Sequence, residues 1–415
     1  MERKDFEIMA PVGCYESLYA AIEAGADAIY FGVEGLNMRA RSSVNFTLDD
    51  LHNIANICTE HGVKSYLTVN TIIYDNDIEA CHKIIDAVKQ SGISAIIASD
   101  IAAISYARSI DVEVHISTQV NVSNIEAVRF YAQFADVVVL ARELNMEQVR
   151  AIYDAIELED IRGPHGERVR IEMFCHGALC MAVSGKCYLS LHEYNHSANR
   201  GSCFQICRRG YEVTDLETGR QLEVDNKYIM SPKDLCTIEF MDKMFNAGVK
   251  VFKIEGRARG AEYVKKVASA YRRAADLLEE GTFTPEKATE FKKELEEVFN
   301  RGFWDGYYQG ARLGEWSKVY GSNATRKKTY IGKVTNYFSN IGVAEILVEA
   351  APISVGQHLM IIGPTSGVVE MDLDEIRVEL QPAQSASQGP HCSIPCPQRV
   401  RRADKVYLFE KIENN

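Results

Sequence analysis

The sequence predicts an α/β protein: a (β/α)8 barrel with a cysteine-rich insertion after its seventh strand, followed by a small antiparallel β-barrel. Eight short apolar runs alternate with amphipathic stretches over the first 256 residues. Six of these runs are apolar or β-branched almost throughout, as is typical of parallel strands covered on both faces. Short alternating runs begin after residue 330. A doubly wound open sheet is the alternative, and the count of eight repeats favours the barrel.

The elements follow from the periodicity of the apolar residues. The eight predicted strands cover residues 6–12, 28–32, 64–70, 94–99, 112–117, 136–141, 169–174 and 249–255. Helices are predicted over residues 16–24, 48–61, 77–90, 101–108, 124–133, 146–156, 261–280 and 285–300. Near the C-terminus, strands are predicted at 331–337, 341–347, 357–362, 368–380 and 405–409, with a polar loop at 381–389.

The strand–helix alternation is interrupted once, by an insertion of about 75 residues at 175–250. In a barrel this insertion would leave from the carboxyl ends of the strands, where the loops of such folds build active sites. We therefore expect a barrel over residues 1–260 that includes the insertion, a helical extension and linker over 261–327, and a C-terminal β-barrel domain over 328–415.

The composition is that of a folded globular protein, with 46% hydrophobic and 25% charged residues. A net charge of −12 argues against broad nonspecific binding of nucleic acid, although three short basic runs could form local patches. These runs are Arg208–Arg209, Arg326–Lys328 and Arg399–Arg402. No apolar stretch is long enough for a signal peptide or a membrane span, so we expect a cytoplasmic protein without a membrane partner or structural disulfides.

Six of the eleven cysteines lie between residues 175 and 236. Thiolates this dense in a reducing compartment indicate a metal or cluster site. There is no Cys-x-x-Cys pair, as in a zinc ribbon, and neither ferredoxin spacing is present. The spacing therefore leaves the metal unidentified, and buried thiols in a compact insertion are the alternative.

Polar residues at the ends of the predicted strands are candidates for the mouth of the barrel. Lys253, Glu255 and Arg257 alternate along the eighth strand and share one face. We predict that these three are catalytic, binding an anion and moving a proton through the carboxylate; an internal ion-pair network is the alternative. Arg39 and Arg41 could clamp a dicarboxylate or a phosphate through forked hydrogen bonds. The other predicted substrate-binding residues are Asn70, Gln119, Arg142 and His176.

One segment resembles a known family. From Glu172 to Ser190 the fixed positions of the signature of the U32 "peptidase" family are matched. The matching residues are Glu172, Phe174, Gly177, Ala178, Leu179, Cys180, Gly185, Cys187, Leu189 and Ser190. The resemblance extends over residues 5 to about 320, and the C-terminal region is similar to the collagenase-like C-terminal domain of the family.

The resemblance implies oxygen-independent hydroxylation. One branch of the family converts uridine 34 of tRNA to 5-hydroxyuridine, another modifies a ribosomal RNA cytidine, and a third modifies ubiquinone precursors. Carried over by motif, the ligands of a [4Fe-4S] cluster would be Cys180, Cys187, Cys203 and Cys236, while Cys207 or Cys175 could replace one of them. The length and the C-terminal domain are most similar to the tRNA branch. This implies tRNA and a small anionic metabolite such as prephenate as partners, and it allows a partner subunit of the same family.

Other functions remain open at this stage. A peptidase is less supported because neither His-Glu-x-x-His nor Gly-x-Ser-x-Gly occurs. Cys175 and His176 are adjacent, but neighbouring side chains on a strand point to opposite faces. An rRNA or a quinone precursor could be the substrate instead, and a non-catalytic RNA-binding scaffold is the remaining alternative.

Overall fold

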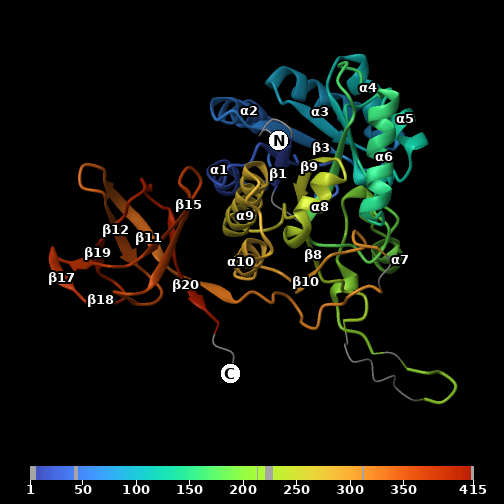
Figure 1. Ribbon diagram of the computed structural model, residues 1–415. Coiled ribbons are helices and arrows are strands. Elements are labelled where there is room, and N and C mark those ends of the chain that lie inside the picture. Colours follow the sequence, from blue (N-terminus) through green and yellow to red (C-terminus); the bar gives the residue numbers. More distant parts are fainter. Residues whose placement is uncertain (1–5, 42–44, 213, 220–227, 311–312, 413–415) are drawn as a thin grey trace.

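Eight parallel strands form a closed barrel (Figure 1) in the computed structural model, which describes residues 6–41, 45–212, 214–219, 228–310 and 313–412. The strands are β1 (Glu7–Pro11), β2 (Ala28–Phe31), β3 (Lys64–Val69), β4 (Ala95–Ala98), β5 (Val114–Ile116), β6 (Val137–Val139), β7 (Arg170–Gly177) and β9 (Val249–Ile254). Each pairs with its neighbour in chain order, and β9 pairs with both β1 and β7. The ring is thereby closed, which confirms the predicted (β/α)8 barrel and excludes the open sheet.

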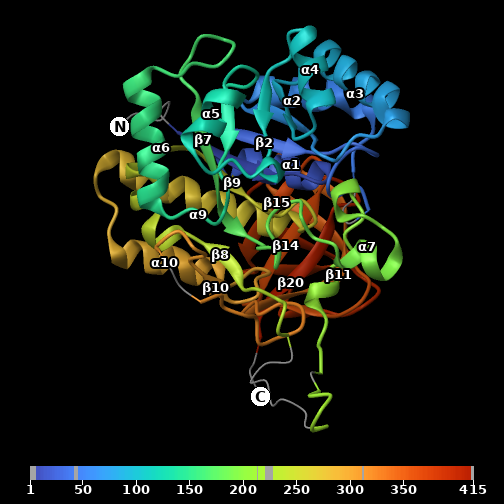
Figure 2. The same ribbon diagram turned by 90° about the vertical axis from the view of Figure 1, so that its right-hand side faces the viewer.

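Helices surround the barrel in both views (Figures 1 and 2). They are α1 (Tyr15–Glu23), α2 (Leu51–Glu60), α3 (Ile78–Ser91), α4 (Ile101–Ser109), α5 (Ile125–Tyr131), α6 (Met146–Glu159), α8 (Met241–Asn246), α9 (Ala261–Glu280) and α10 (Pro285–Leu295). The side chains of Asp100, Asn124 and Asn145 begin α4, α5 and α6 by accepting backbone N–H bonds of the first turn. Such caps satisfy donors that have no partner within the helix.

The insertion between β7 and β9 lies at one end of the barrel in both views (Figures 1 and 2). It contains α7 (Leu189–Tyr194) and a short strand, β8 (Asp234–Cys236), which runs antiparallel to β7. Strand β10 (Phe303–Trp304) then pairs with β8 and extends this wall. Helix α8 precedes β9 and restores the strand–helix alternation.

The C-terminal region is an antiparallel β structure around its own apolar core. Its strands are β11 (Arg326–Phe338), β12 (Val343–Val348), β13 (Ile353–Ser354), β14 (His358–Gly363), β15 (Gly367–Asp372), β16 (Ile376–Val378), β17 (Gln381–Ala383), β18 (Ser385–Ala386), β19 (His391–Pro395) and β20 (Lys405–Lys411). The main sheet has the order β15-β14-β20-β11-β12-β19-β16-β17. The predicted antiparallel architecture of this region is therefore confirmed.

Two details of the prediction for this region are wrong. Residues 368–380 form two strands, because the chain leaves β15 after Asp372 and a turn at Glu379 and Leu380 follows β16, with both residues at positive φ. Residues 381–389 are not all loop, since β17 pairs with β16 and β18 pairs with β13. The residues of β17 are mostly exposed, so an edge strand of this kind lacks the apolar alternation on which the prediction depends.

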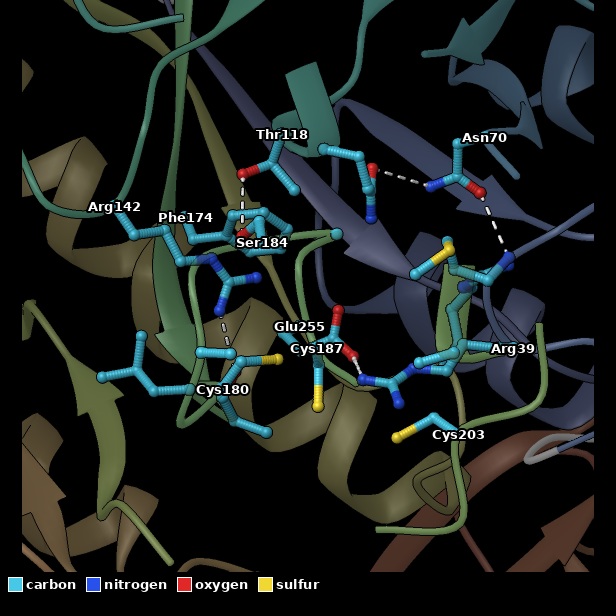
Figure 3. A pocket seen from close by; sticks show the side chains of 18 of the residues that line it. Arg39, Asn70, Thr118, Arg142, Phe174, Cys180, Ser184, Cys187, Cys203 and Glu255 are labelled. Atoms are coloured by element: carbon cyan, nitrogen blue, oxygen red, sulfur yellow. Dashed lines mark hydrogen bonds and ion pairs between the residues drawn. The ribbon is translucent and has the colours of Figure 1, made fainter. Parts of the chain in front are cut away.

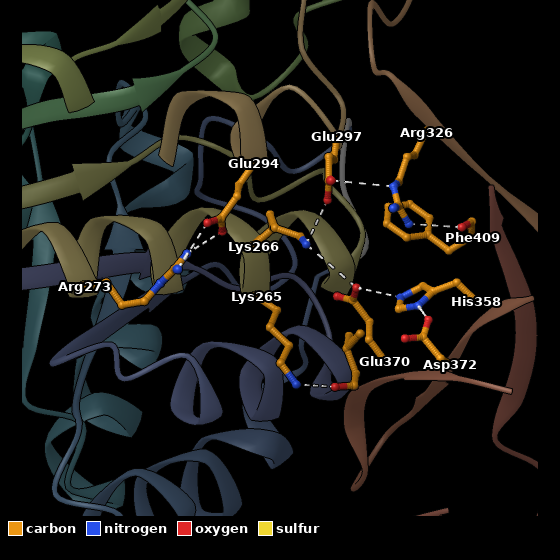
Figure 4. Close-up of polar contacts among 11 residues, drawn as sticks. Lys265, Lys266, Arg273, Glu294, Glu297, Arg326, His358, Glu370, Asp372 and Phe409 are labelled. Carbon is orange, nitrogen blue, oxygen red and sulfur yellow. Dashed lines mark hydrogen bonds and ion pairs between the residues drawn. The ribbon is translucent and has the colours of Figure 1, made fainter. Parts of the chain in front are cut away.

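The C-terminal sheet packs on the barrel through α1, α9 and β15. Apolar contact is made by Ala20, Ala261, Met360, Val368 and Phe409. Ion pairs surround this apolar contact. Arg326 contacts Glu297 at 3.6 Å and Lys266 contacts Glu370 at 3.8 Å (Figure 4). Lys328 also contacts Glu262 at 2.8 Å. Arg326 and Lys328 are thus held against the barrel by these ion pairs. Among the three basic runs, Arg399–Arg402 is the one whose arginines are all exposed.

Across the described residues, no helix is both long enough and apolar enough to cross a membrane.

Candidate active site

A cavity of about 180 Å³ lies at the carboxyl end of the barrel strands, under the insertion (Figure 3). Asn70, Gln119 and Arg142, which follow β3, β5 and β6, line it together with Arg39 from the segment after β2. Lys253, Glu255 and Arg257 line it from β9 and the residues after it. The strand-end positions that the sequence predicts for the mouth of the barrel therefore converge on one space. We call this space the barrel pocket.

Four cysteines of the insertion also line the barrel pocket: Cys180, Cys187, Cys203 and Cys207. Figure 3 shows the sulfur atoms of Cys180, Cys187 and Cys203 in the space around Glu255 and Arg39. Burial raises the pKa of the Cys207 thiol, Arg208 lowers it, and the other three cysteines raise it again through their charge. The four cysteines thus share the lining of one pocket.

Cys236, the fourth ligand implied by the family resemblance, is placed elsewhere. It ends β8, does not line the barrel pocket, and is buried beside Tyr271 and Cys175. Burial raises the pKa of its thiol to about 12. Cys175 is also turned away from the pocket, because its Sγ donates to the carbonyl of Lys253 at 3.4 Å. The structure therefore unites three of the four predicted ligands and adds Cys207.

The four thiols can be compared with the ligand sets of metal groups that proteins hold on sulfur. In the described part of the chain, no three His, Cys, Asp or Glu side chains are close enough together to hold a single metal ion. A tetrahedral zinc site needs every sulfur about 2.3 Å from one ion. In a [4Fe-4S] cluster each cysteine binds a different iron, so the ligand sulfurs are farther apart. Four thiols around one pocket are the kind of donor set that a [4Fe-4S] cluster takes.

Glu255 is the only carboxylate among the described residues that line the barrel pocket. Its Oε1 accepts from Arg39 Nη2 at 2.7 Å, and its Oε2 accepts from Tyr30 at 3.3 Å. Burial alone would raise its pKa, but Arg39, Arg142 and Arg257 together lower it to about 2. Glu255 is therefore ionised at neutral pH, and it can orient Arg39 but cannot supply a proton.

Two further arginines reach the pocket with donors unused. Arg142 lies over the Phe174 ring, 3.8 Å from its centroid, and donates to the carbonyl of Ala178 at 2.9 Å. Arg257 donates to Thr68 Oγ1 at 2.8 Å, and burial lowers the pKa of its guanidinium to about 10. The Nε atoms of both arginines are buried without a partner among the described residues. Since a buried donor without a partner is costly, these atoms point to a ligand that would accept from them.

Cations outnumber carboxylates around the pocket. The lining cations are Arg39, Arg142, Arg208, Lys253, Arg257, Arg259 and Arg301. The charge of Lys253 is balanced inside the barrel, because its Nζ forms an ion pair with Glu172 Oε1 at 2.6 Å. The remaining surplus suits an anionic ligand such as a carboxylate or a phosphate.

Close backbone packing at the family signature brings β7 and β9 together at the pocket. Gly177 has a φ of +102°, and a Cβ at this position would lie 2.4 Å from the carbonyl oxygen of Glu255. Any other residue would push apart the two strand ends that carry Glu255 and Cys180. The glycine of the signature therefore serves the geometry of the site.

Two predicted substrate-binding residues do not reach the pocket. Arg41 is exposed, and its backbone N–H donates to the carbonyl of Gly201 at 3.4 Å. His176 is buried against Tyr271 and Phe303, and burial lowers the pKa of its imidazole to about 3, so the ring is neutral. Neither residue lines the barrel pocket.

Three arginines of the pocket were not predicted as site residues. Arg208 is partly buried and donates to the carbonyls of Pro232 and Leu179 at 2.7 and 2.5 Å, rather than forming a surface patch with Arg209. Arg259 and Arg301 reach the pocket from beyond β9 and from the segment before β10. Arg208 was marked in the sequence only as part of the basic run Arg208–Arg209, and no signal marked the other two.

Comparison with known proteins identifies relatives over most of the chain. The family model described as "Peptidase family U32" matches residues 13–318. A protein named "Collagenase" from Porphyromonas gingivalis (strain ATCC BAA-308 / W83) is 60% identical over 413 residues, covering 100% of both chains. "tRNA hydroxylation protein P1" of Bacillus subtilis (strain 168) is 33% identical, covering 80% of this chain and 77% of its own. "23S rRNA 5-hydroxycytidine C2501 synthase" of Escherichia coli (strain K12) is 34% identical, covering 74% of this chain and 46% of its own.

Proposed function

Because this chain belongs to peptidase family U32 and gathers four cysteines and a surplus of cations in its barrel pocket, we propose that it is an iron–sulfur enzyme that hydroxylates RNA. Uridine 34 of tRNA is the proposed substrate base and 5-hydroxyuridine the product. The relatives named for tRNA hydroxylation and for hydroxycytidine synthesis support an RNA substrate. The single observation that carries the proposal is the set of four sulfurs around the pocket. Action on tRNA implies a cytoplasmic enzyme.

Cys180, Cys187, Cys203 and Cys207 would hold a [4Fe-4S] cluster. Bound there, such a cluster supplies one-electron transfer beside the substrate. Replacing the C5–H bond of uridine by C5–OH removes two electrons and takes up one oxygen atom, so a reaction without O₂ needs an electron acceptor and an oxygen donor. The protein side chains bind and orient these reactants.

The roles of the pocket residues follow from their contacts. Arg39 and Arg142 would bind the carboxylates of an anionic metabolite such as prephenate, or a phosphate of the RNA. Glu255 fixes Arg39, and Arg257 completes the positive floor, while Lys253 is paired with Glu172. Asn70, whose Nδ2 lies 3.3 Å from Gln119 Oε1, forms with Gln119 an amide pair that can read the edge of a base. The exposed Arg399–Arg402 run offers contacts to RNA phosphates away from the pocket.

The first test is iron and acid-labile sulfide per chain after anaerobic purification, in the wild type, Cys207→Ala and Cys236→Ala. We expect about four of each per chain in the wild type, a loss in Cys207→Ala and retention in Cys236→Ala. The opposite pattern would restore Cys236 as the fourth ligand. No iron in the wild type would overturn the proposed cofactor.

The substrate is tested by mass spectrometry of RNA from a strain that lacks the gene. We expect 5-hydroxyuridine to disappear from tRNA and to return with the wild-type gene but not with Cys180→Ala. Loss of a ribosomal RNA hydroxycytidine, or of a quinone intermediate, would move the activity to that substrate. Unchanged modification of all three would favour an RNA-binding scaffold.

A second candidate function is supported by one specific comparison. The relative named "Collagenase" is 60% identical over the whole of both chains, which favours peptidase activity. The chemistry of the pocket gives less support, because no pocket cysteine is hydrogen-bonded to a histidine among the contacts of the described residues. Thiols that ligate iron are also unavailable as nucleophiles. Gelatin and a collagen-derived peptide, incubated with iron-loaded and iron-free protein, should both remain intact.

A further inference from the structure

A second, smaller cavity adjoins the barrel pocket and has an aromatic lining. Its volume is about 40 Å³, and the two cavities share a wall that includes Arg142, Cys180 and Met181. Trp304, Tyr307 and Trp316 line its other side. The chain contains only two tryptophans, and both are here.

One ring of this cavity belongs to the buried core, whereas the other two are partly open to solvent. Trp304 is buried in β10 and packs edge-on against Tyr307, with ring centroids 5.2 Å apart and an interplanar angle of 76°. Tyr307 is 40% exposed, and Trp316 is partly exposed where its backbone bridges to Pro232. The buried indole N–H of Trp304 has no acceptor among the described residues. Buried tryptophans usually find one, so a ligand acceptor would satisfy this donor.

We propose that this cavity is a stacking subsite for a nucleobase of single-stranded RNA, adjacent to the base that enters the barrel pocket. The inference rests on the proposed RNA function and extends it to the neighbouring nucleotide. Aromatic side chains stack splayed bases in single-stranded RNA recognition. Arg142 lies on the shared wall, and the other arginines line the barrel pocket, so the phosphate that joins two successive nucleotides would meet cations between the two cavities.

The size and polarity of the cavity agree with one flat ring. One water needs roughly 10–15 Å³ of such space, so the cavity holds the equivalent of a few waters. Arg142 and Glu143 at its edge provide a donor and an acceptor for the polar edge of a base. An aromatic side chain of a peptide could also stack on these rings, but a peptide has no phosphate that the arginines could bind.

The test is a binding titration of a fluorescently labelled anticodon stem-loop RNA with anaerobically purified full-length protein. Trp316→Leu removes the ring, and Trp316→Phe keeps an aromatic face as the matched control. We expect Trp316→Leu to weaken binding by about 5- to 150-fold, the range for one stacked base, and Trp316→Phe by much less. Two further RNAs carry an abasic site on the 5′ or the 3′ side of uridine 34. We expect one of these abasic RNAs to bind the wild type as weakly as intact RNA binds Trp316→Leu. The same abasic RNA should bind Trp316→Leu no more weakly than it binds the wild type.

Three results would overturn the subsite. The first is equal affinity of the wild type and both Trp316 variants for intact RNA. The second is that Trp316→Leu weakens the binding of intact RNA and of both abasic RNAs by the same factor, because the ring would then support only the protein structure. Binding of an aromatic peptide that depends on Trp316, without such dependence for RNA, is the third. This test and the test of the proposed function can fail independently. Binding can depend on Trp316 and the neighbouring base although the deletion strain loses no 5-hydroxyuridine, and the deletion strain can lose 5-hydroxyuridine although binding does not depend on Trp316.

Discussion

The barrel holds a carboxylate among cations at each end, Glu7 buried and Glu255 partly buried, and the two ends differ in how the charges balance. At the amino ends of the strands, Glu7 accepts from Tyr66 at 2.8 Å and pairs with Lys64 and Arg170 at 3.1 and 3.2 Å. At the carboxyl ends, Glu255 contacts Arg39 at 2.7 Å and lies among Arg142 and Arg257.

The amino-terminal group is satisfied, whereas the pocket group is not. No buried nitrogen or oxygen of Glu7, Tyr66 or Arg170 lacks a partner in the described part of the chain. In the pocket, the Nε atoms of Arg142 and Arg257 lack one. A network that satisfies itself supports the fold, whereas surplus charge and unused donors mark a site that is completed by a ligand.

The largest expected effect is that of Glu255→Gln. Removing one partner of a buried ion pair leaves uncompensated charge and typically costs about 3–5 kcal/mol. We expect the free energy of unfolding in denaturant at pH 7 to fall by roughly 3 kcal/mol, while sulfate or prephenate binds more tightly in calorimetry because the positive surplus grows. Weaker anion binding would show instead that Glu255 is needed to orient Arg39.

Lowering the pH should reveal the same contribution of the Glu255 carboxylate to stability. Glu255 has a folded-state pKa of about 2 against an ordinary value of 4.5, so its stabilisation is present above pH 4.5 and is lost as the pH falls toward 2. The shift corresponds to roughly 3 kcal/mol at most. Unfolding measured from pH 6 to pH 2.5 should therefore lose less stability in Glu255→Gln than in the wild type. Parallel curves for the two proteins would contradict the lowered pKa.

Glu7→Gln tests the charged group at the amino ends of the strands. Lys64 and Arg170 are partly exposed, so water can compensate part of the lost charge. We expect a loss of about 1–3 kcal/mol in the free energy of unfolding, with iron content and anion affinity unchanged. A change in anion affinity would mean that the two ends are coupled.

The smallest effect on stability is expected for Arg142→Lys. The charge stays, but the guanidinium fork and its stacking on Phe174 are lost. We expect about tenfold weaker anion binding and a stability change within about 1 kcal/mol. The exposed Arg41→Lys is the matched control and should change neither quantity.

The sequence determined the barrel and the positions from which its site is built. Eight apolar runs at the spacing of strand–helix units favoured a ring of parallel strands over an open sheet, and the residues that follow the strands of such a ring meet at one end. Arg39, Asn70, Gln119, Arg142, Lys253, Glu255 and Arg257 reach the barrel pocket for this reason. Cys180, Cys187 and Cys203, which the resemblance to the family implied as ligands, also line this pocket.

Tertiary structure alone decided the rest. Cys207 and Cys236 are equivalent in a list of cysteines, but pairing of β8 with β7 holds Cys236 behind the barrel wall while Cys207 faces the pocket. His176 and Arg41 follow the same strand-end logic, yet one side chain points into packed aromatics and the other into solvent. Arg259 and Arg301 join from distant segments. Local sequence fixes which residues a strand presents, but the direction of a loop, and what packs against it, depend on contacts between residues far apart in the chain.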